Sequence, residues 1–108
     1  MFPKKKRVTK EFFNQIMKKG TTLSGSFFVF KYIFNLDLPR YTFVVPKKVS
    51  SKAVERNKLK RRGLNVIRPF LFKNSMGIFF YKKTSIKASS QEIKEDIYSL
   101  LKKAKIII

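Results

Sequence analysis

The sequence contains no cysteine and no histidine among its 108 residues. Without cysteine the chain forms no disulfide and offers no thiolate to a zinc ion, and nothing points to an oxidising compartment. Without histidine it lacks the commonest metal ligand and the side chain that most often acts as a general base near neutral pH. These absences exclude the most frequent kinds of metal centre and of protein-borne acid–base catalysis.

Acidic residues are scarce: six Asp and Glu stand against 26 Lys and Arg, a formal net charge of +20. Cleavage of a phosphodiester by a protein typically needs carboxylates that hold metal ions, or histidines. Glu11, Asp37 and Glu55 are isolated from one another. The other three acids stand at the start of a predicted C-terminal helix, where they complement its dipole; they are Glu92, Glu95 and Asp96. We therefore expect no catalytic residue and no metal site in the protein itself.

Long apolar runs are also missing, and none approaches the roughly 20 residues of a transmembrane helix. The N-terminal MFPKKKRV has no apolar segment behind its charges, so we do not expect it to act as a secretory signal. Its PKKKRV string looks like a nuclear-localisation signal, but such a run is expected by chance in so basic a chain. We expect a cytoplasmic protein with a single domain over residues 1–108, of which residues 1–8 form a basic arm.

What the chain does contain is apolar surface and positive charge. Hydrophobic residues make up 44% and include twelve Phe, which suffices for one small core. A surface with a net charge of +20 repels itself and is usually tolerated because a polyanion neutralises it. The candidate partners are RNA, DNA and an anionic membrane.

The pattern of apolar residues predicts an α+β protein with its elements in the order αββαβα. The predicted helices cover about 10–19, 51–68 and the segment from 89 on, and the predicted strands cover 27–34, 41–45 and 77–83. We expect the first two strands to form a hairpin across the turn at 35–39. We also expect all helices to lie on one face of a small sheet, as a two-layer sandwich.

Capping residues support these helix boundaries. Thr9 can cap the first helix, and Gly20 can end it. Pro69 ends or kinks the second helix. Ser89 begins a capping box with Glu92. The apolar residues of the last helix then form one stripe, which comprises Ile93, Ile97, Leu100, Leu101 and Ala104.

The second helix contains VERNKLKRRGLNVIRP, with six bases against the single acid Glu55. At 100° per residue one stripe is apolar and faces the core, namely Leu59, Gly63, Val66 and Ile67. The opposite side is cationic and amide: Asn57, Arg61, Asn65 and Arg68, flanked by Lys58, Lys60 and Arg62. Two residues break the pattern, because Arg56 falls on the side of the stripe and Leu64 on the outer side.

A solvated helix face would also be charged, but such faces usually intersperse acids with bases, since opposite pairs stabilise a helix and like pairs destabilise it. Here no acid follows Glu55 until Glu92. This uncompensated repulsion favours a surface that binds a polyanion. The arginine fork suits phosphate geometry, and Asn57 can donate to and accept from a base edge or a sugar.

The stretch VPKKVSSKAVERNKLKRR resembles the signature of the bacterial ribonuclease P protein family, whose basic helix has an Ala-Val-x-Arg-Asn-Arg-Ile/Leu-Lys-Arg core. Here this core runs from Ala53 to Arg61, with Lys58 where the family usually has Arg. KEFFNQIMKKGTTLSGSFFVF also resembles the family's first helix and strand, with Phe13 seven residues before Gly20. The resemblance covers nearly the whole chain.

This resemblance implies a small α/β sandwich with a left-handed β-α-β crossover, where the general rule expects a right-handed one. It implies the protein subunit of an endoribonuclease whose RNA is catalytic, with that RNA and precursor tRNA as partners. The implied RNA-binding residues are Lys47, Lys48, Lys52, Arg56, Asn57, Lys58, Lys60, Arg61, Arg62 and Arg68. No membrane and no small-molecule substrate are expected.

The family holds the 5′ leader of precursor tRNA in a cleft between its first helix and its central sheet. The matching positions are Phe13, Met17 and Lys31; the last two replace aromatic residues usual in the family. The protein alone is expected to hold no cofactor, while magnesium in the ribonucleoprotein is bound mainly by RNA.

Two other hypotheses stay open. One is a generic basic RNA-binding protein of ribosomal type, from which the Arg56–Asn57 helix core distinguishes this chain. The other is an anionic-membrane binder, which is weakened because the basic helix has no spare apolar face for lipid.

Overall fold

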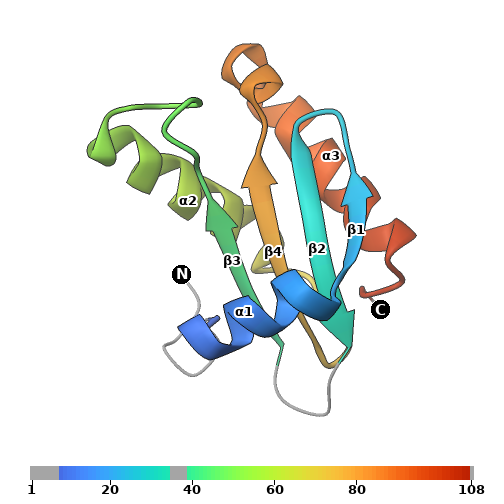
Figure 1. The fold of residues 1–108 in the computed structure, drawn as a ribbon. Coiled ribbons are helices and arrows are strands. Elements are labelled where there is room, and N and C mark those ends of the chain that lie inside the picture. The colour runs from blue at the N-terminus through green and yellow to red at the C-terminus, as the bar shows by residue number, and fades with distance from the viewer. Residues whose placement is uncertain (1–7, 35–38, 108) are drawn as a thin grey trace.

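The computed structural model describes residues 8–34 and 39–107 and shows an α+β fold in this part of the chain (Figure 1). Its elements are α1 (Lys10–Lys19), β1 (Thr21–Ser24), β2 (Phe28–Phe34), β3 (Arg40–Val44), α2 (Ala53–Ile67), β4 (Ser75–Tyr81), the 3-10 helix η2 (Lys83–Lys87) and α3 (Ser90–Lys103). The predicted class and the αββαβα order are confirmed, with β1 as an additional strand. Residues 1–7 of the predicted N-terminal arm and residues 35–38 of the predicted turn lie outside the described residues.

The four strands form one mixed sheet in the order β1-β2-β4-β3. β2 pairs antiparallel with β1 and β4, whereas β3 pairs parallel with β4. The predicted hairpin between the strands around 27–34 and 41–45 is therefore wrong, because β4 lies between them. The hairpin was predicted from the short, turn-like connection between the two strands, which is only a local signal. β4 is buried on both faces, and such a strand suits a central place in the sheet.

Side chains alternate between the two faces of the sheet, and each face has its own helices. On one face Met76 and Ile78 of β4 pack with Ile16 of α1. On the other face a larger cluster that includes Phe28 and Phe79 is covered by α2 and α3. The expectation that all helices share one face is thus wrong for α1. Its apolar residues predict which side of the helix is buried, but they do not predict which face of the sheet it covers.

The connection from β3 through α2 to β4 is a left-handed crossover, as the resemblance implied. Figure 1 views the sheet from the α1 side, with β3 and β4 pointing the same way, β4 to the right of β3, and α2 behind. A right-handed connection would require β4 on the other side of β3. The crossover places α2 against β3, on the face of the sheet that α3 also covers.

Local capping fixes the helix boundaries as predicted. Phe12 donates its N–H to Thr9 Oγ1 at 3.3 Å, and the Gly20 N–H reaches the Ile16 carbonyl at 2.7 Å. At α3 the Glu92 N–H donates to Ser89 Oγ and the Ser89 N–H donates to Glu92 Oε1, which completes the capping box. The predicted apolar stripe of α3 is buried over its whole length.

Asp96 has a more specific role than complementing the helix dipole. Its carboxylate accepts the backbone N–H groups of Ser26 at 3.0 Å and Phe27 at 2.9 Å, which fastens the β1–β2 turn to α3. Lys82 holds the same turn from β4's end through hydrogen bonds of 2.7 Å to Ser24 Oγ and to the Gly25 carbonyl. These contacts fix the orientation of α3 relative to the sheet.

Candidate nucleic-acid interface

Helix α2 is seated closely on the sheet. A Cβ on Gly63 would lie 2.5 Å from Cε2 of Phe43, so only glycine permits this approach. The Tyr81 hydroxyl donates to the Leu59 carbonyl at 2.8 Å. Burial raises the pKa of Tyr81 to about 12, opposed in part by the positive charge of Arg62. The predicted buried stripe therefore faces the sheet, and it sets which side of α2 is exposed.

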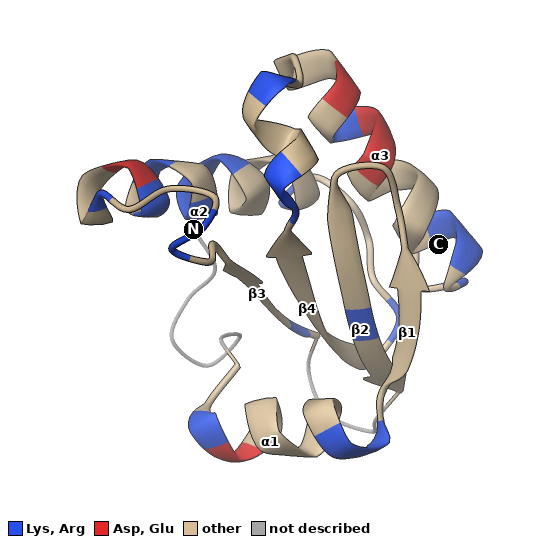
Figure 2. Ribbon diagram, turned by 45° about the horizontal axis from the view of Figure 1, so that its top comes forward, with Lys and Arg blue, Asp and Glu red and all other residues tan. Residues whose placement is uncertain are grey.

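The opposite side of α2 presents cations to solvent, and Figure 2 shows blue segments along this helix. Its predicted binding residues are exposed: Asn57, Lys58, Lys60, Arg61, Arg62 and Arg68. Lys47, Lys48 and Lys52, in the segment that leads into the helix, are exposed too. We call these nine residues the α2 cationic face. Leu64, which the helical wheel placed outward, is half-buried, because α2 also contacts α3.

Arg56 differs from the other predicted binding residues because it is half-buried and engaged within the protein. Its Nη1 donates to the carbonyls of Ser50 at 3.1 Å and Ser51 at 2.8 Å. The neighbouring Glu55 accepts a 2.8 Å hydrogen bond from Ser50 Oγ. These two residues fix the segment before α2, so the only acid of this helix contributes to shaping the α2 cationic face.

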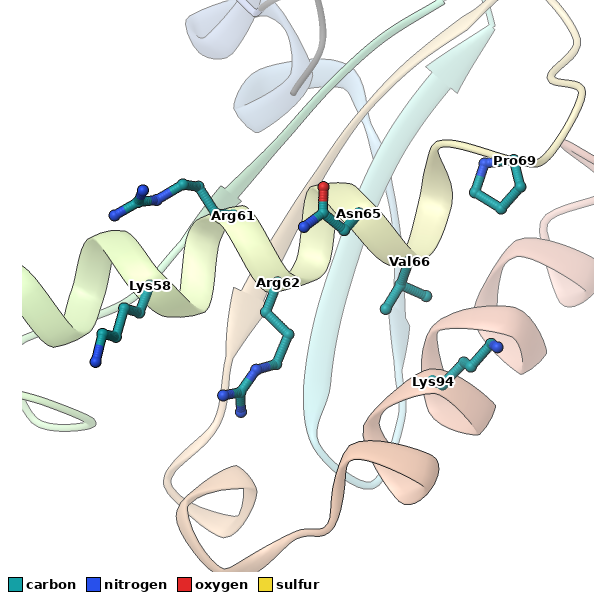
Figure 3. Close-up of a pocket in the computed structure, with 7 residues that line it drawn as sticks. All are labelled: Lys58, Arg61, Arg62, Asn65, Val66, Pro69 and Lys94. Carbon is teal, nitrogen blue, oxygen red and sulfur yellow. The ribbon is translucent and has the colours of Figure 1, made fainter.

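An open groove of about 630 Å³ runs between α2 and α3 (Figure 3). Its described lining residues are Lys58, Arg61, Arg62, Asn65, Val66, Pro69 and Lys94, and none of them is acidic. Lys94 comes from α3, across the groove from the α2 cations (Figure 3). Lys94 could not be predicted, because no local sequence pattern signals that a residue about thirty positions later faces the basic helix.

The three predicted leader-cleft residues lie on the other face of the sheet, with α1. Phe13 packs its ring edge-on against Phe80 of β4, with 6.4 Å between centroids. Lys31 of β2 pairs in register with Ile78, which contributes to the cluster under α1. Met17 is 41% exposed and so is available to a ligand. The α1 face and the α2 cationic face are therefore separate surfaces.

Arg40 extends the aromatic and cationic character of the α1 face. Its guanidinium carbon lies 4.8 Å from the ring centre of Phe12, within the range of a cation–π contact. Sequence reasoning did not identify Arg40, because β1 and β2 separate it from Phe12 along the chain. Among residues 8–34 and 39–107, no group of three or more acids forms a potential metal site. No described helix is long and apolar enough to cross a membrane.

Comparisons with known proteins agree with this geometry. The family model described as Ribonuclease P matches residues 2–105. The "Ribonuclease P protein component" of Syntrophomonas wolfei is 33% identical over 109 residues, covering 96% of this chain and 91% of the relative. The protein of the same description from Pseudanabaena is 32% identical, covering 99% of this chain and 97% of the relative.

Two solved structures share the fold. The RNase P protein of Staphylococcus aureus matches with a TM-score of 0.81 and 26% identity, covering 95% of this chain and 98% of that one. The RNase P protein of Thermotoga maritima matches with a TM-score of 0.75 and 28% identity, covering 84% of this chain and 89% of that one. The fold, the basic helix and the family match together place this chain in the Ribonuclease P protein family.

Proposed function

We propose that this protein is the protein subunit of ribonuclease P: it binds a catalytic RNA and assists the removal of the 5′ leader from precursor tRNA. The α2 cationic face carries the proposal, because a single exposed acid, Glu55, stands among its exposed cations and cannot offset their repulsion. Phosphates of a docked RNA would neutralise this face and release counterions. Family membership favours this function over a generic ribosomal type of RNA-binding protein.

The protein's own residues position RNA, and they do not cleave it. The described residues offer no cluster of carboxylates for metal ions, and the chain has no histidine. We therefore assign the magnesium ions and the hydrolysis to the RNA. Asn57, Arg61 and their neighbours bind the catalytic RNA, while Phe13, Met17 and Lys31 contact the leader.

Docking on the catalytic RNA is tested by Arg61→Ala. With about six phosphate contacts, wild-type affinity falls on the order of 1000-fold between roughly 50 and 200 mM salt. The variant binds more weakly and shows a smaller salt slope, by about one unit for each lost phosphate contact. Lys103→Ala is the matched control, because Lys103 is an exposed cation that lies outside the α2 cationic face. Filter binding across a salt series makes the comparison, and wild-type behaviour of Arg61→Ala would refute the assignment.

Leader contact is tested on the reconstituted ribonucleoprotein with precursor and mature tRNA. Phe13→Leu keeps an apolar side chain against Phe80 but removes the aromatic ring, so it should weaken binding of the precursor by about 1–3 kcal/mol if a base stacks there. Lys31→Gln removes one charge and should have a smaller effect. Mature tRNA lacks the leader, so its affinity should hardly change. Equal losses for both tRNAs would show that these residues do not read the leader.

A further inference from the structure

Helix α3 carries a stripe of cations around an exposed tyrosine. Lys94, Tyr98 and Lys102 follow one another at intervals of four residues and therefore lie on one side of the helix. Both lysines are exposed, and Tyr98 is 41% exposed. Lys94 lines the groove shared with α2, so this stripe begins where the α2 cationic face ends.

The stripe continues into a second hollow of about 390 Å³. This hollow is lined by Lys73, Tyr98, Lys102, Lys105 and Ile107. None of these lining residues is acidic. The two hollows share no lining residue, but Lys94 in the first and Tyr98 in the second lie one helical turn apart, and we call the two hollows together the basic track. The track runs from α2 past Pro69, which borders the first hollow, to the C-terminal end of α3.

None of the acids of α3 lies three or four residues from Lys94 or Lys102, so none forms a helical pair with a lysine of the stripe. Glu92, Glu95 and Asp96 line a separate hollow with Ser26 and Phe27. Asp96 is bound to the turn there, and Glu95 accepts a hydrogen bond from Gln91. An ordinary solvated helix would place some of these acids beside the lysines, where opposite pairs stabilise. The segregation leaves the flank beside α2 with unopposed positive charge.

Tyr98 is suited to stack on a base. Its ring lies against Phe70, with 5.6 Å between centroids and 33° between planes, so its orientation is fixed by packing. Lys102 Nζ lies 5.3 Å from the ring centre. Because the lysine side chain is flexible, a base can take its place over the ring while the ammonium moves to the adjoining phosphate. An aromatic ring between cations is the usual platform for single-stranded nucleic acid.

We propose that the RNA-docking surface extends from α2 onto α3, where Lys94 contacts a phosphate of the catalytic RNA in the groove and Tyr98 stacks on an unpaired base of the same RNA. This inference rests on the proposed function and adds a second helix to its binding surface. Lys73 and Lys102 contact the phosphates on either side of the stacked base. The simpler alternative is that Tyr98 only covers Phe70 and the lysines are solvated.

The experiment measures affinity of the intact protein for the transcribed ribonuclease P RNA of the same organism across a salt series. Tyr98→Ala should weaken binding roughly 5- to 100-fold, the range expected for one stacked base, while Tyr98→Phe keeps the ring and binds as wild type. Lys94→Gln should lower the salt slope by about one unit. Lys103→Gln, an exposed cation outside the track, should change neither quantity.

Thermal melts and a comparison with Arg61→Ala distinguish a loss of folding from a loss of RNA docking. Thermal melts identify any variant that loses structure, and Tyr98→Leu, which retains apolar cover for Phe70, replaces Tyr98→Ala if the latter unfolds. If Arg61→Ala weakens binding but Lys94→Gln and the Tyr98 variants bind as wild type, the α3 surface is refuted and the proposed function stands. If Arg61→Ala also binds as wild type, the proposed function itself fails.

Discussion

Replacing Gly63 with alanine tests how closely α2 must approach the sheet. The added Cβ would lie 2.5, 2.6 and 2.8 Å from three ring carbons of Phe43. That ring is 1% exposed and stacks on Phe79 at 4.8 Å with 10° between planes, so it cannot move aside. Helix α2 would have to lift from the sheet and carry its cations with it.

Two effects of opposite sign determine how much Gly63→Ala changes the free energy of unfolding. Overpacking a core typically costs about 1–3 kcal/mol, whereas alanine in place of glycine inside a helix gains about 1 kcal/mol. Since three contacts fall well inside van der Waals distance, we expect a net loss of about 1–2 kcal/mol and a melting temperature lower by roughly 5–10 °C. Thermal and urea unfolding measure both. Lys60→Ala, on the exposed side, should change stability by less than about 0.5 kcal/mol.

A double-mutant cycle identifies the cause. Phe43→Leu makes room for the added methyl group, so Gly63→Ala should cost at least about 1 kcal/mol less in that background. A stability of Gly63→Ala equal to or above that of wild type would refute the close contact. So would an equal cost in both backgrounds.

Three further predictions concern the hydrogen bonds of Asp96 and the ionisation of Glu92 and Tyr81. Asp96→Ala leaves the Ser26 and Phe27 N–H groups without their acceptor, so it should lower the free energy of unfolding by roughly 1.5–3 kcal/mol in urea titrations. Asp96→Asn should lower it by less. An unchanged free energy in Asp96→Ala would contradict a stabilising role for these two hydrogen bonds. Hydrogen bonds from the Ser89 backbone and hydroxyl lower the pKa of Glu92, so its stabilisation is present above the ordinary value of 4.5 and lost as pH falls through the lower folded pKa; Glu92→Gln should flatten this acid dependence. The pKa of Tyr81 is raised to about 12, so its stabilisation is present below 10.0 and lost as pH rises through 12; a phenolate signal near the ordinary pKa that disappears in Tyr81→Phe would contradict its burial.

The local features of the fold could be predicted from the sequence. Thr9 and Gly20 bound α1, and the Ser89 capping box begins α3, because each motif depends on residues within one or two turns. The sheet order could not be predicted in this way. Placing β4 between β2 and β3 depends on pairs of residues that lie from 36 (Arg40 and Met76) to 53 (Phe28 and Tyr81) positions apart in the sequence. β1 was missed because TTLS has one apolar residue and no alternating pattern of burial.

In the candidate site, too, the features of a single helix could be predicted, and those that depend on packing between distant elements could not. The exposed side of α2 follows from the 3.6-residue period, and Arg61 lies where the helical wheel placed it. Arg56 holds the preceding segment through the carbonyls of Ser50 and Ser51, which no periodicity shows. Lys94 and Tyr98 join the basic surface only because α3 packs beside α2. The chemistry of each single helix could therefore be predicted from the sequence, whereas the surfaces shared by two helices could not.

Our proposal is that the protein positions RNA while the RNA performs the cleavage. Its most direct test is cleavage of precursor tRNA in three parallel reactions that contain the protein alone, the partner RNA with Arg61→Ala at limiting concentration, and the partner RNA with wild-type protein. With magnesium present, the wild-type complex should release the 5′ leader, the Arg61→Ala complex should require more protein for the same rate, and the protein alone should cleave nothing. Leader release by the protein alone, after exclusion of contaminating nuclease, would contradict the account.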